Sequence, residues 1–422
     1  MLVDSWLERA AASHPDRAAV NALTYAELLA RARAGVQDLR DRGIVPGDRV
    51  ALALPAGDAF CVALHACLLA GAVAVPVDPR LGEAERAVVV GGAAVVDAPL
   101  AVFAAGKVAP VRHDLEAPAI VVHTSGTGGT PKPIALTYGN WLWSALGSAT
   151  ALGLDPHERW LSAMPLSHVG GLSIVLRSAI GATTAIVHER FDTERVLAEL
   201  RDPAGPTVVS VVPTTLRRLL DAGLERPPAL RWALVGGAPV PDGLLARATE
   251  AGVPAAATYG LTEACSQVAT RGVPLFCTRV RVAGDGEILV SGPTVAPGAV
   301  AADGWLHTGD LGALSPDGLL SITGRAADTI ITGGENVSPA EVEAVLEEHP
   351  AVAEAVAFGR ADEIWGEALH AMVVLVDGAA VGEDQLRAFA ASRLAAFKVP
   401  KFIAFTAALP RTPSGKLLRR AL

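Results

Sequence analysis

The sequence predicts two domains: a large N-terminal domain of layered α/β sheets and a small α+β domain at the C-terminal end. Three observations support this prediction. At 422 residues the chain exceeds the length of one ordinary domain. Apolar, β-branched runs alternate with helical patterns over the first three-quarters of the chain, which is typical of βαβ units. After Asp285 the pattern changes to short strands separated by Gly and Pro turns.

The composition indicates a well-buried globular protein. Hydrophobic residues make up 51% of the chain and charged residues 19%, which excludes a disordered protein. The net charge of −9 argues against general nucleic-acid binding, because such binding needs a basic face. The four cysteines form neither a CxxC pair nor a metal-binding spacing, so we interpret them as reduced core thiols and expect a cytoplasmic protein.

The first elements can be assigned from local signals. Charges at Asp4, Glu8 and Arg9 argue against a signal peptide. Thr24-x-x-Glu27 is a capping box that opens an amphipathic helix running towards residue 42. The uncharged stretch 60–77 has the apolar character of a membrane span, but Gly and Pro interrupt it. We therefore expect a buried helix up to residue 70, a strand over 72–77 and no membrane insertion.

The remaining elements follow in order. Helical segments between successive strands predict parallel pairing in the first domain. Its strands are expected at 50–54, 72–77, 119–122, 159–163, 207–212, 232–235 and 255–259. Beyond them we expect strands at 287–291 and 318–323, a helix at 339–348, and strands at 352–358 and 371–376. The domain boundary is placed near 325–328, which gives domains of residues 1–327 and 328–422.

A Gly-rich loop after the strand at 119–122 predicts a phosphate site. Glycines let backbone N–H groups approach an anion, hydroxyl groups add donors and lysine adds a charge. The loop is neither a Walker A loop nor a Rossmann fingerprint, because Pro131 stands where each of them needs Gly. The alternative is an ordinary Gly-rich turn. The residues of the predicted cradle are Thr124, Ser125, Gly126, Thr127, Gly128, Gly129, Thr130 and Lys132.

Lysine is rare in this chain, so the position of each lysine is informative. Of 35 basic residues only five are lysines, and arginine serves almost everywhere else. Lysine is a compact, mobile point charge that suits a single phosphate or a developing oxyanion. Lys132 lies in the loop above, and Lys416 ends a second Gly-containing turn that begins at Pro410. Lys107 is interpreted as a surface residue.

Further motifs follow in an order that argues against chance. Residues 258–263 read Thr-Tyr-Gly-Leu-Thr-Glu and offer an aromatic ring, a hydroxyl group and a carboxylate for a hard cation. Residues 305–310 end in Asp310 after a Gly turn, which suits two ribose hydroxyls. Gly-Arg-Ala-Ala-Asp at 324–328 and a Gly-rich stretch at 332–338 come next. Taken singly, each of these could be a plain turn at a strand end.

Together these residues resemble the adenylate-forming superfamily of acyl-CoA synthetases, nonribosomal adenylation domains and luciferases. The resemblance rests on 124–132, 259–263, 307–310, 324–328 and 410–416 and covers nearly the whole chain. It implies that the small C-terminal domain is a mobile lid hinged at Asp328. It also implies ATP, Mg²⁺ and coenzyme A as ligands.

The resemblance assigns roles to single residues. It makes Lys416, Thr262, Glu263 and His168 catalytic, with Glu263 holding Mg²⁺, and it places pyrophosphate on the loop 124–132. The other residues implied in binding ATP or coenzyme A are Gly236, Thr258, Tyr259, Gly260, Asp310, Arg325, Gly333 and Gly334. Gly128 and Pro133 depart from the family's loop, and 269–282 and 291–305 look shortened, so the phosphate and adenine contacts there are expected to differ.

Within the superfamily, the middle of the chain most resembles the o-succinylbenzoate–CoA ligases of menaquinone biosynthesis, notably at 137–141, 164–178, 188–192 and 260–267. Their substrate has two carboxylates, of which one is activated and the other must meet a cation. Arg177 is the candidate cation, and His168 and Ser210 are further candidates for binding the acyl group. The alternatives are a helix arginine at an interface and a satisfied core histidine.

Two other enzymatic functions stay open at this point. Another aryl- or fatty-acyl-CoA ligase would have no use for a cation at the end of the pocket. An amino-acid or aryl-acid adenylating enzyme that loads a carrier protein would need, for an amino acid, a carboxylate to pair with the substrate's amino group. We expect no such carboxylate beside 165–171. The expected partners are therefore a small carboxylic acid, ATP and coenzyme A, and a homodimer is one compatible oligomeric state.

Overall fold

The protein is described by a computed structural model that covers residues 1–101, 110–124, 131–332, 335–362, 364–411, 417–419 and 422. These residues form two compact units. The first unit comprises Met1–Val240, Leu244–Val280 and Val290–Leu306, and the second comprises Pro241–Gly243, Arg281–Leu289 and His307–Leu422. The boundary predicted at 327/328 concerns where the lid turns, and it stays a prediction.

A five-stranded sheet in the first unit has the order β6-β4-β5-β8-β9, and its first four strands are parallel. The strands predicted at 50–54, 72–77 and 119–122 are confirmed as β4, β5 and β8. The antiparallel strand β9 was not predicted, because the Pro and Lys residues at its start are unusual in a strand. The strands are β4 (Arg49–Leu52), β5 (Val73–Pro76), β6 (Ala94–Val96), β8 (Pro118–Thr124) and β9 (Lys132–Thr137).

A nine-stranded sheet in the same unit has the order β16-β15-β14-β13-β12-β10-β11-β2-β3. Strands β10 to β14 pair in parallel, as the alternation of helix and strand predicted. Its strands are β2 (Ala18–Val20), β3 (Leu23–Thr24), β10 (Arg159–Ser162), β11 (Thr184–Val187), β12 (Val208–Val211), β13 (Trp232–Val235), β14 (Ala255–Leu261), β15 (Ser266–Thr270) and β16 (Val273–Pro274). A separate pair joins β1 (Leu2–Asp4) to β7 (Arg112–Asp114).

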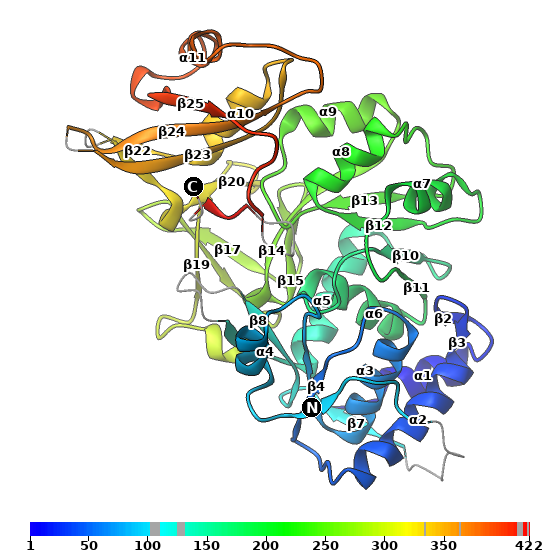
Figure 1. Ribbon diagram of the computed structural model, residues 1–422. Helices are drawn as coiled ribbons and strands as arrows, with labels where there is room; N and C mark the ends of the chain where they lie inside the picture. The colour runs from blue at the N-terminus through cyan, green and yellow to red at the C-terminus, as the bar shows by residue number, and fades with distance from the viewer. Residues whose placement is uncertain (102–109, 125–130, 333–334, 363, 412–416, 420–421) are drawn as a thin grey trace. The chain divides into compact units, whose positions relative to one another are not determined.

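Helices and sheets alternate in layers within this unit (Figure 1). Val208 and Leu234 share one core with both sheets and the central helices, whereas their neighbours Val209 and Val235 pack with α7, α8 and α9 on the opposite face. This alternation is the period of two expected of strands buried on both faces. The central helices are α1 (Trp6–Ser13), α2 (Tyr25–Asp41), α3 (Asp58–Ala70), α5 (Tyr138–Leu152) and α6 (Val169–Gly181). The outer helices are α4 (Glu83–Val90), α7 (Thr193–Arg201), α8 (Pro213–Asp221) and α9 (Asp242–Glu250).

The two local predictions near the N-terminus are confirmed. Thr24 accepts a hydrogen bond from the backbone N–H of Glu27, and the Glu27 carboxylate accepts one from the backbone N–H of Thr24. The uncharged stretch is the buried helix α3 followed by β5, and it lacks charge because α3 lies in the central layer. Among the described residues, no helix is both long enough and apolar enough to span a bilayer.

A four-stranded sheet, in the order β17-β18-β19-β20, follows the nine-stranded sheet in the chain. The strands predicted at 287–291 and 318–323 are confirmed as β18 and β20. Its strands are β17 (Arg279–Val282), β18 (Glu287–Ser291), β19 (Leu306–Leu314) and β20 (Leu320–Arg325). Short 3₁₀ turns lie at η1 (Thr262–Ala264), η2 (Pro297–Ala299), η3 (Ala326–Asp328) and η4 (Ala396–Lys398).

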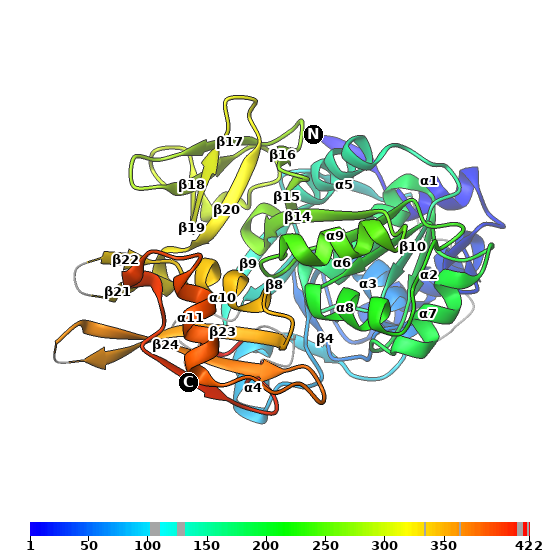
Figure 2. The ribbon, with the colours of Figure 1, turned by 90° about the horizontal axis from the view of Figure 1, so that it is seen from above.

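The C-terminal end of the second unit is a five-stranded sheet with two helices on one face, as can be followed in Figure 2. The helix and strands predicted at 339–348, 352–358 and 371–376 are confirmed. The β23–β24 hairpin is longer than predicted, because charged residues continue both strands on a face that is not buried. The elements are β21 (Ile330–Thr332), β22 (Glu335–Val337), α10 (Pro339–Glu347), β23 (Val352–Asp362), β24 (Gly366–Leu375), α11 (Glu383–Ala391) and β25 (Phe402–Phe405).

Two buried histidines in the first unit predict loss of stability in acid. His65 on α3 is buried, and its Nε2 has no hydrogen-bond partner among the described residues. His113 stacks on Tyr138, with ring centroids 4.2 Å apart. Burial lowers the pKa of each imidazole to about 4, and for His65 the nearby His113 contributes to the shift.

We expect the free energy of unfolding to fall as the pH drops from 6.5 to 4, because the unfolded chain binds protons on these histidines before the folded protein does. The loss is roughly 3 kcal/mol for each histidine and is complete below the folded-state pKa. Urea unfolding at successive pH values measures it. A His65→Leu variant should show a smaller pH dependence, and the matched substitution of the exposed His157 by Leu should leave the dependence unchanged. Equal slopes for wild type and His65→Leu would contradict this assignment.

Candidate functional site

The predicted phosphate loop joins two paired strands. Thr124 ends β8, Lys132 begins β9, and the two residues are partners in the antiparallel register. The hydroxyl of Thr124 lies 3.5 Å from the backbone oxygen of Lys132. Ser125, Gly126, Thr127, Gly128, Gly129 and Thr130 lie outside the described residues. The loop therefore leaves the carboxyl end of a parallel strand, which is where open α/β sheets bind ligands.

Gly236 and Thr258 lie side by side at the carboxyl ends of the neighbouring strands β13 and β14. A Cβ on Gly236 would come within 2.4 Å of Oγ1 of Thr258 and 3.1 Å of its backbone oxygen. Only glycine fits this approach, so the two predicted nucleotide residues form one surface. Gly260 is constrained in the same way, because a Cβ there would lie 1.7 Å from the backbone oxygen of Ser266. The register shift between Tyr259 and Gly260 marks this point as a β-bulge.

The segment carrying Thr262 and Glu263 is fixed by an unusual backbone. The two residues form η1, directly after β14. Cys265 and Ser266 then have φ values of +53° and +89°, two successive left-handed conformations that non-Gly residues rarely adopt. Backbone strain of this kind concentrates at functional sites and persists only where the surroundings enforce it. The sequence did not reveal this backbone conformation, because neither Cys nor Ser is typical of left-handed positions.

Glu263 can serve as the protein ligand of a magnesium ion. Its backbone oxygen accepts a hydrogen bond from the N–H of Ala296 at 2.7 Å, which ties the turn to the following segment. No group of three His, Cys, Asp or Glu side chains that could hold a metal exists among the described residues. A single carboxylate is nevertheless what Mg²⁺ uses when substrate phosphates and water complete its shell. The donor set therefore fits magnesium bound together with a nucleotide.

His168 lies directly before α6, where it is the N-cap residue. Its Nε2 is 3.9 Å from Oδ2 of Asp78, and the hydroxyl of the preceding Ser167 donates to the same oxygen at 3.2 Å. The tertiary structure thus brings one carboxylate, that of Asp78, to the segment 165–171. Asp78 is 87 residues before the nearer end of that segment in sequence, so no local pattern could reveal the contact.

Arg177 is buried on α6 and has unused hydrogen-bonding capacity. One terminal nitrogen, Nη2, donates to the hydroxyl of Ser144 at 3.0 Å, and the guanidinium lies over the ring of Trp160, 5.4 Å from its centroid. Its Nε has no hydrogen-bond partner among the described residues, and Glu158 acts on the guanidinium only through a longer-range charge interaction. Burial lowers the pKa of Arg177 to about 10, so the group remains charged at neutral pH.

Ser210 belongs to the same cluster as Arg177. The indole N–H of Trp160 donates to the Ser210 hydroxyl at 2.9 Å, so one ring contacts both predicted substrate residues. Ser144 in turn donates to the backbone oxygen of Cys265, at the strained turn described above. The first unit thus joins the predicted acyl-binding residues to the segment that follows Glu263. Trp160 and Ser144 are members of this cluster that the sequence analysis missed.

The second unit carries the other predicted site residues. Asp310 on β19 and Arg325 on β20 are register partners, and Nε of Arg325 donates to Oδ1 of Asp310 at 2.7 Å. Asp310 is buried, so this contact orients its carboxylate. The predicted hinge residue Asp328 lies in η3, and its Oδ2 is 3.6 Å from Nε of Arg419.

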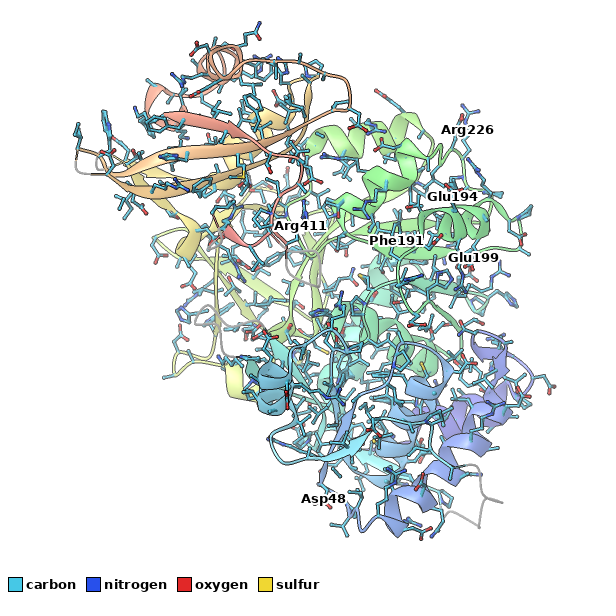
Figure 3. All side chains as sticks on the ribbon, in the orientation of Figure 1. Asp48, Phe191, Glu194, Glu199, Arg226 and Arg411 are labelled. Atoms are coloured by element: carbon cyan, nitrogen blue, oxygen red, sulfur yellow. The ribbon has the colours of Figure 1, made fainter. Side chains whose placement is uncertain are left out.

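Three predicted residues of the second unit, Gly333, Gly334 and Lys416, lie outside the described residues. Arg411 and Leu417, on either side of the predicted lysine turn, form an antiparallel β-bridge. Arg411, labelled in Figure 3, also pairs with Glu354 at 2.7 Å. The chain that leads to Lys416 is therefore anchored to β23.

Comparisons with known proteins agree with this geometry. The AMP-binding enzyme model matches residues 7–96 and 93–299, and the model of the AMP-binding enzyme C-terminal domain matches residues 341–416. The 2-succinylbenzoate–CoA ligase of Bacillus licheniformis is 37% identical over 481 aligned residues, covering 100% of both chains.

Solved structures give the same result. The o-succinylbenzoate CoA synthetase of Bacillus subtilis in complex with its acyl-adenylate intermediate superposes with a TM-score of 0.92 at 34% identity, covering 100% of this chain and 98% of that one. The same Bacillus enzyme in complex with ATP and a magnesium ion gives a TM-score of 0.91 at 33% identity, covering 100% of both chains.

Proposed function

This chain belongs to the AMP-binding enzyme family, and from that premise we propose that it is an ATP-dependent acid–thiol ligase that converts 2-succinylbenzoate into 2-succinylbenzoyl-CoA through an acyl-AMP. Full-length relatives that carry out this ligation support the reaction. The observation that carries the choice of acid is the buried guanidinium of Arg177, whose Nε has no hydrogen-bond partner among the described residues. A buried charge without a partner costs several kcal/mol, so an anionic ligand is the natural completion of this site. The reaction is a step of menaquinone biosynthesis.

The first half-reaction makes the acid a better acyl donor. A carboxylate oxygen of the substrate attacks the α-phosphorus of ATP in line, the new P–O bond forms, and the bond to pyrophosphate breaks. Catalysis consists of positioning the two reactants and stabilising charge on the phosphoryl oxygens. Thr262 contacts the α-phosphate, and the loop 124–132 holds the departing pyrophosphate. Mg²⁺, held by Glu263, would neutralise charge on the phosphates.

The residues that contact the nucleoside form the next part of this proposal. Gly236, Thr258, Tyr259 and Gly260 contact the adenine and α-phosphate side, where Gly236 lies close against Thr258. Asp310 accepts hydrogen bonds from the ribose hydroxyls. Arg325 keeps the Asp310 carboxylate oriented through their 2.7 Å contact. Lys416 brings its ammonium to the α-phosphoryl oxygen during transfer of the adenylyl group to the acid.

The second half-reaction requires the thiol of coenzyme A at the acyl carbon. The sulfur attacks the acyl carbonyl, the C–S bond forms, the C–O bond to phosphate breaks and AMP leaves with its charge, while the thiol proton passes to solvent. We propose that the domain 328–422 turns about Asp328, so that Lys416 leaves and Gly333 and Gly334 line the path of the pantetheine arm. The contact between Asp328 and Arg419 is made in one of these two states.

The acyl site separates the two other candidate functions. A carrier-loading enzyme specific for amino acids needs a free carboxylate for the substrate's amino group. Asp78 lies near His168, but Arg80 already engages both of its oxygens, at 2.8 and 2.6 Å. A ligase for a monocarboxylic acid would leave Arg177 unpaired. The geometry therefore favours a dicarboxylic acid over both alternatives.

Exchange of labelled pyrophosphate into ATP tests the assignment. We expect exchange with 2-succinylbenzoate, and little with benzoate, a fatty acid or amino acids. Addition of coenzyme A should then give 2-succinylbenzoyl-CoA, identified by its mass. Exchange with a monocarboxylate but none with 2-succinylbenzoate would reject the proposed acid while keeping the ligase chemistry.

Cellular location and assembly belong to the same proposal. The four cysteines are free thiols in the structure, which suits a reducing compartment, and ATP and coenzyme A are cytoplasmic substrates. We therefore place the enzyme in the cytoplasm. A homodimer stays a prediction, which light scattering of the purified protein tests.

A further inference from the structure

We propose that Asp78 is a positioning residue that acts on the acyl site through His168. The proposal rests on the proposed function, because it takes His168 to border the acid. Asp78 lies two residues beyond the end of β5, in the five-stranded sheet, whereas His168 precedes α6, which follows β10 of the nine-stranded sheet. One carboxylate thus ties together the carboxyl ends of strands from both sheets of the first unit.

Arg80 fixes the carboxylate of Asp78 independently of His168. Its Oδ1 accepts from the backbone N–H of Arg80 at 3.0 Å and from Nε at 2.8 Å, and its Oδ2 accepts from Nη2 at 2.6 Å. This two-pronged contact fixes the plane of the carboxylate. Burial raises the pKa of Asp78, but the hydrogen bonds from Arg80 outweigh it and leave the pKa below its usual value. The group is therefore ionised wherever the enzyme works.

The segment bearing His168 is equally constrained. The Ser167 hydroxyl donates to Oδ2 of Asp78 at 3.2 Å. At the start of α6, a Cβ on Gly171 would lie 2.6 Å from the backbone oxygen of Pro165, so helix and preceding segment pack without space for a side chain. The backbone is therefore constrained on both sides of His168. Only the side-chain torsions of His168 remain free to vary. Asp78 is the acidic group that the structure brings to 3.9 Å from the ring.

The geometry makes Asp78 a positioning residue and not a catalytic one. A carboxylate offers about four acceptor sites, and Arg80 and Ser167 together supply four donors. Neither oxygen is left to bind the acid or take up a proton. At 3.9 Å the interaction with Nε2 of His168 is the attraction between a fixed negative charge and a polar N–H, which selects one ring orientation and tautomer. Asp78 therefore influences the reaction only through His168.

A double-mutant cycle on the full-length enzyme tests this inference. Asp78→Asn keeps the shape of the side chain and removes its charge. We expect it to lower kcat/KM for the acid roughly tenfold in the wild-type background, and by less than about twofold in a His168→Ala background, because coupled residues are non-additive. Multiplicative effects of the two substitutions would overturn the proposal.

The Asp38–Arg42 pair supplies a matched control. Asp38 is also buried and also accepts hydrogen bonds from Nε and Nη2 of an arginine, at 2.9 and 3.1 Å, but it lies on α2. Asp38→Asn should lower the unfolding temperature as Asp78→Asn does and leave kcat/KM unchanged. An equal loss of activity in both variants would show that Asp78 is merely structural, and so would contradict the proposal.

A second variant covers the case in which Asp78→Asn does not fold. Ser167→Ala removes one hydrogen bond to Asp78 and leaves the Arg80 contact intact. We expect a loss of about threefold that again disappears in the His168→Ala background. If the wild-type enzyme were inactive with 2-succinylbenzoate, this result would reject the proposed acid but not the role of Asp78. The cycle would then be measured with the acid that supports pyrophosphate exchange.

Discussion

Replacing Lys416 by alanine is expected to slow acyl-AMP formation by a factor on the order of 10³, because in the proposed mechanism the ammonium stabilises charge that develops on the α-phosphoryl oxygens only in the transition state. Thioester formation from supplied acyl-AMP and coenzyme A should remain close to the wild-type rate, since the proposed mechanism has the lysine leave the site before this step. Rapid-quench measurement of each half-reaction separates the two effects.

Lys398 provides the control for this prediction. It is another of the few lysines, it lies in the same structural unit, and its ammonium pairs with Glu341 at 2.7 Å. Lys398→Ala should leave acyl-AMP formation within about twofold of wild type, because a surface ion pair contributes little. A comparable loss in both half-reactions of Lys416→Ala would contradict the division of labour between two lid positions.

Local signals predicted the elements that build the first unit. The capping box of Thr24 and Glu27 set the start of α2, and continuous apolar runs located β4, β5, β8, β12 and β13. These signals act over a few residues, so one sequence is enough to detect them. Strand β9 escaped detection because Pro and Lys stand at its start, and helix α11 was not predicted either. The order of the strands within each sheet also lay beyond local patterns.

In the candidate site, too, local sequence signals predicted some features and missed those that depend on tertiary structure. Motifs that are continuous in sequence, such as 124–132 and 258–263, led to predictions of phosphate and nucleotide binding before the fold was known, and these stay predictions. Contacts that arise only in the tertiary structure could not be predicted from the sequence. Asp78 meets His168 across two sheets, Trp160 lies under Arg177, and Cys265 is forced into a left-handed conformation by its surroundings. Such long-range pairings leave no periodic trace in a single sequence.

The cluster around Arg177 predicts a large effect of its substitution on the activity towards 2-succinylbenzoate. Ser144 occupies one terminal nitrogen and Trp160 one face of the guanidinium, whereas Nε has no hydrogen-bond partner among the residues that the structure describes. An edge of a guanidinium binds a carboxylate through two parallel hydrogen bonds. Because the group is already desolvated and immobilised by the protein, a substrate carboxylate gains the interaction without ordering the arginine. The cluster is therefore prepared for one distal carboxylate.

Substitution of Arg177 by methionine should consequently lower kcat/KM for 2-succinylbenzoate by about 100-fold, mainly through KM, since a desolvated substrate carboxylate would lose its counter-charge. Exchange with benzoate should not fall, because benzoate has no distal carboxylate to lose a partner. Arg271 is the matched control: it also stacks on an indole, that of Trp232 at 4.9 Å, but it is exposed. Arg271→Met should leave both acids unaffected. If Arg177→Met reduced activity towards benzoate and 2-succinylbenzoate equally, Arg177 would be a structural residue of α6, and the distal carboxylate would have to be recognised elsewhere.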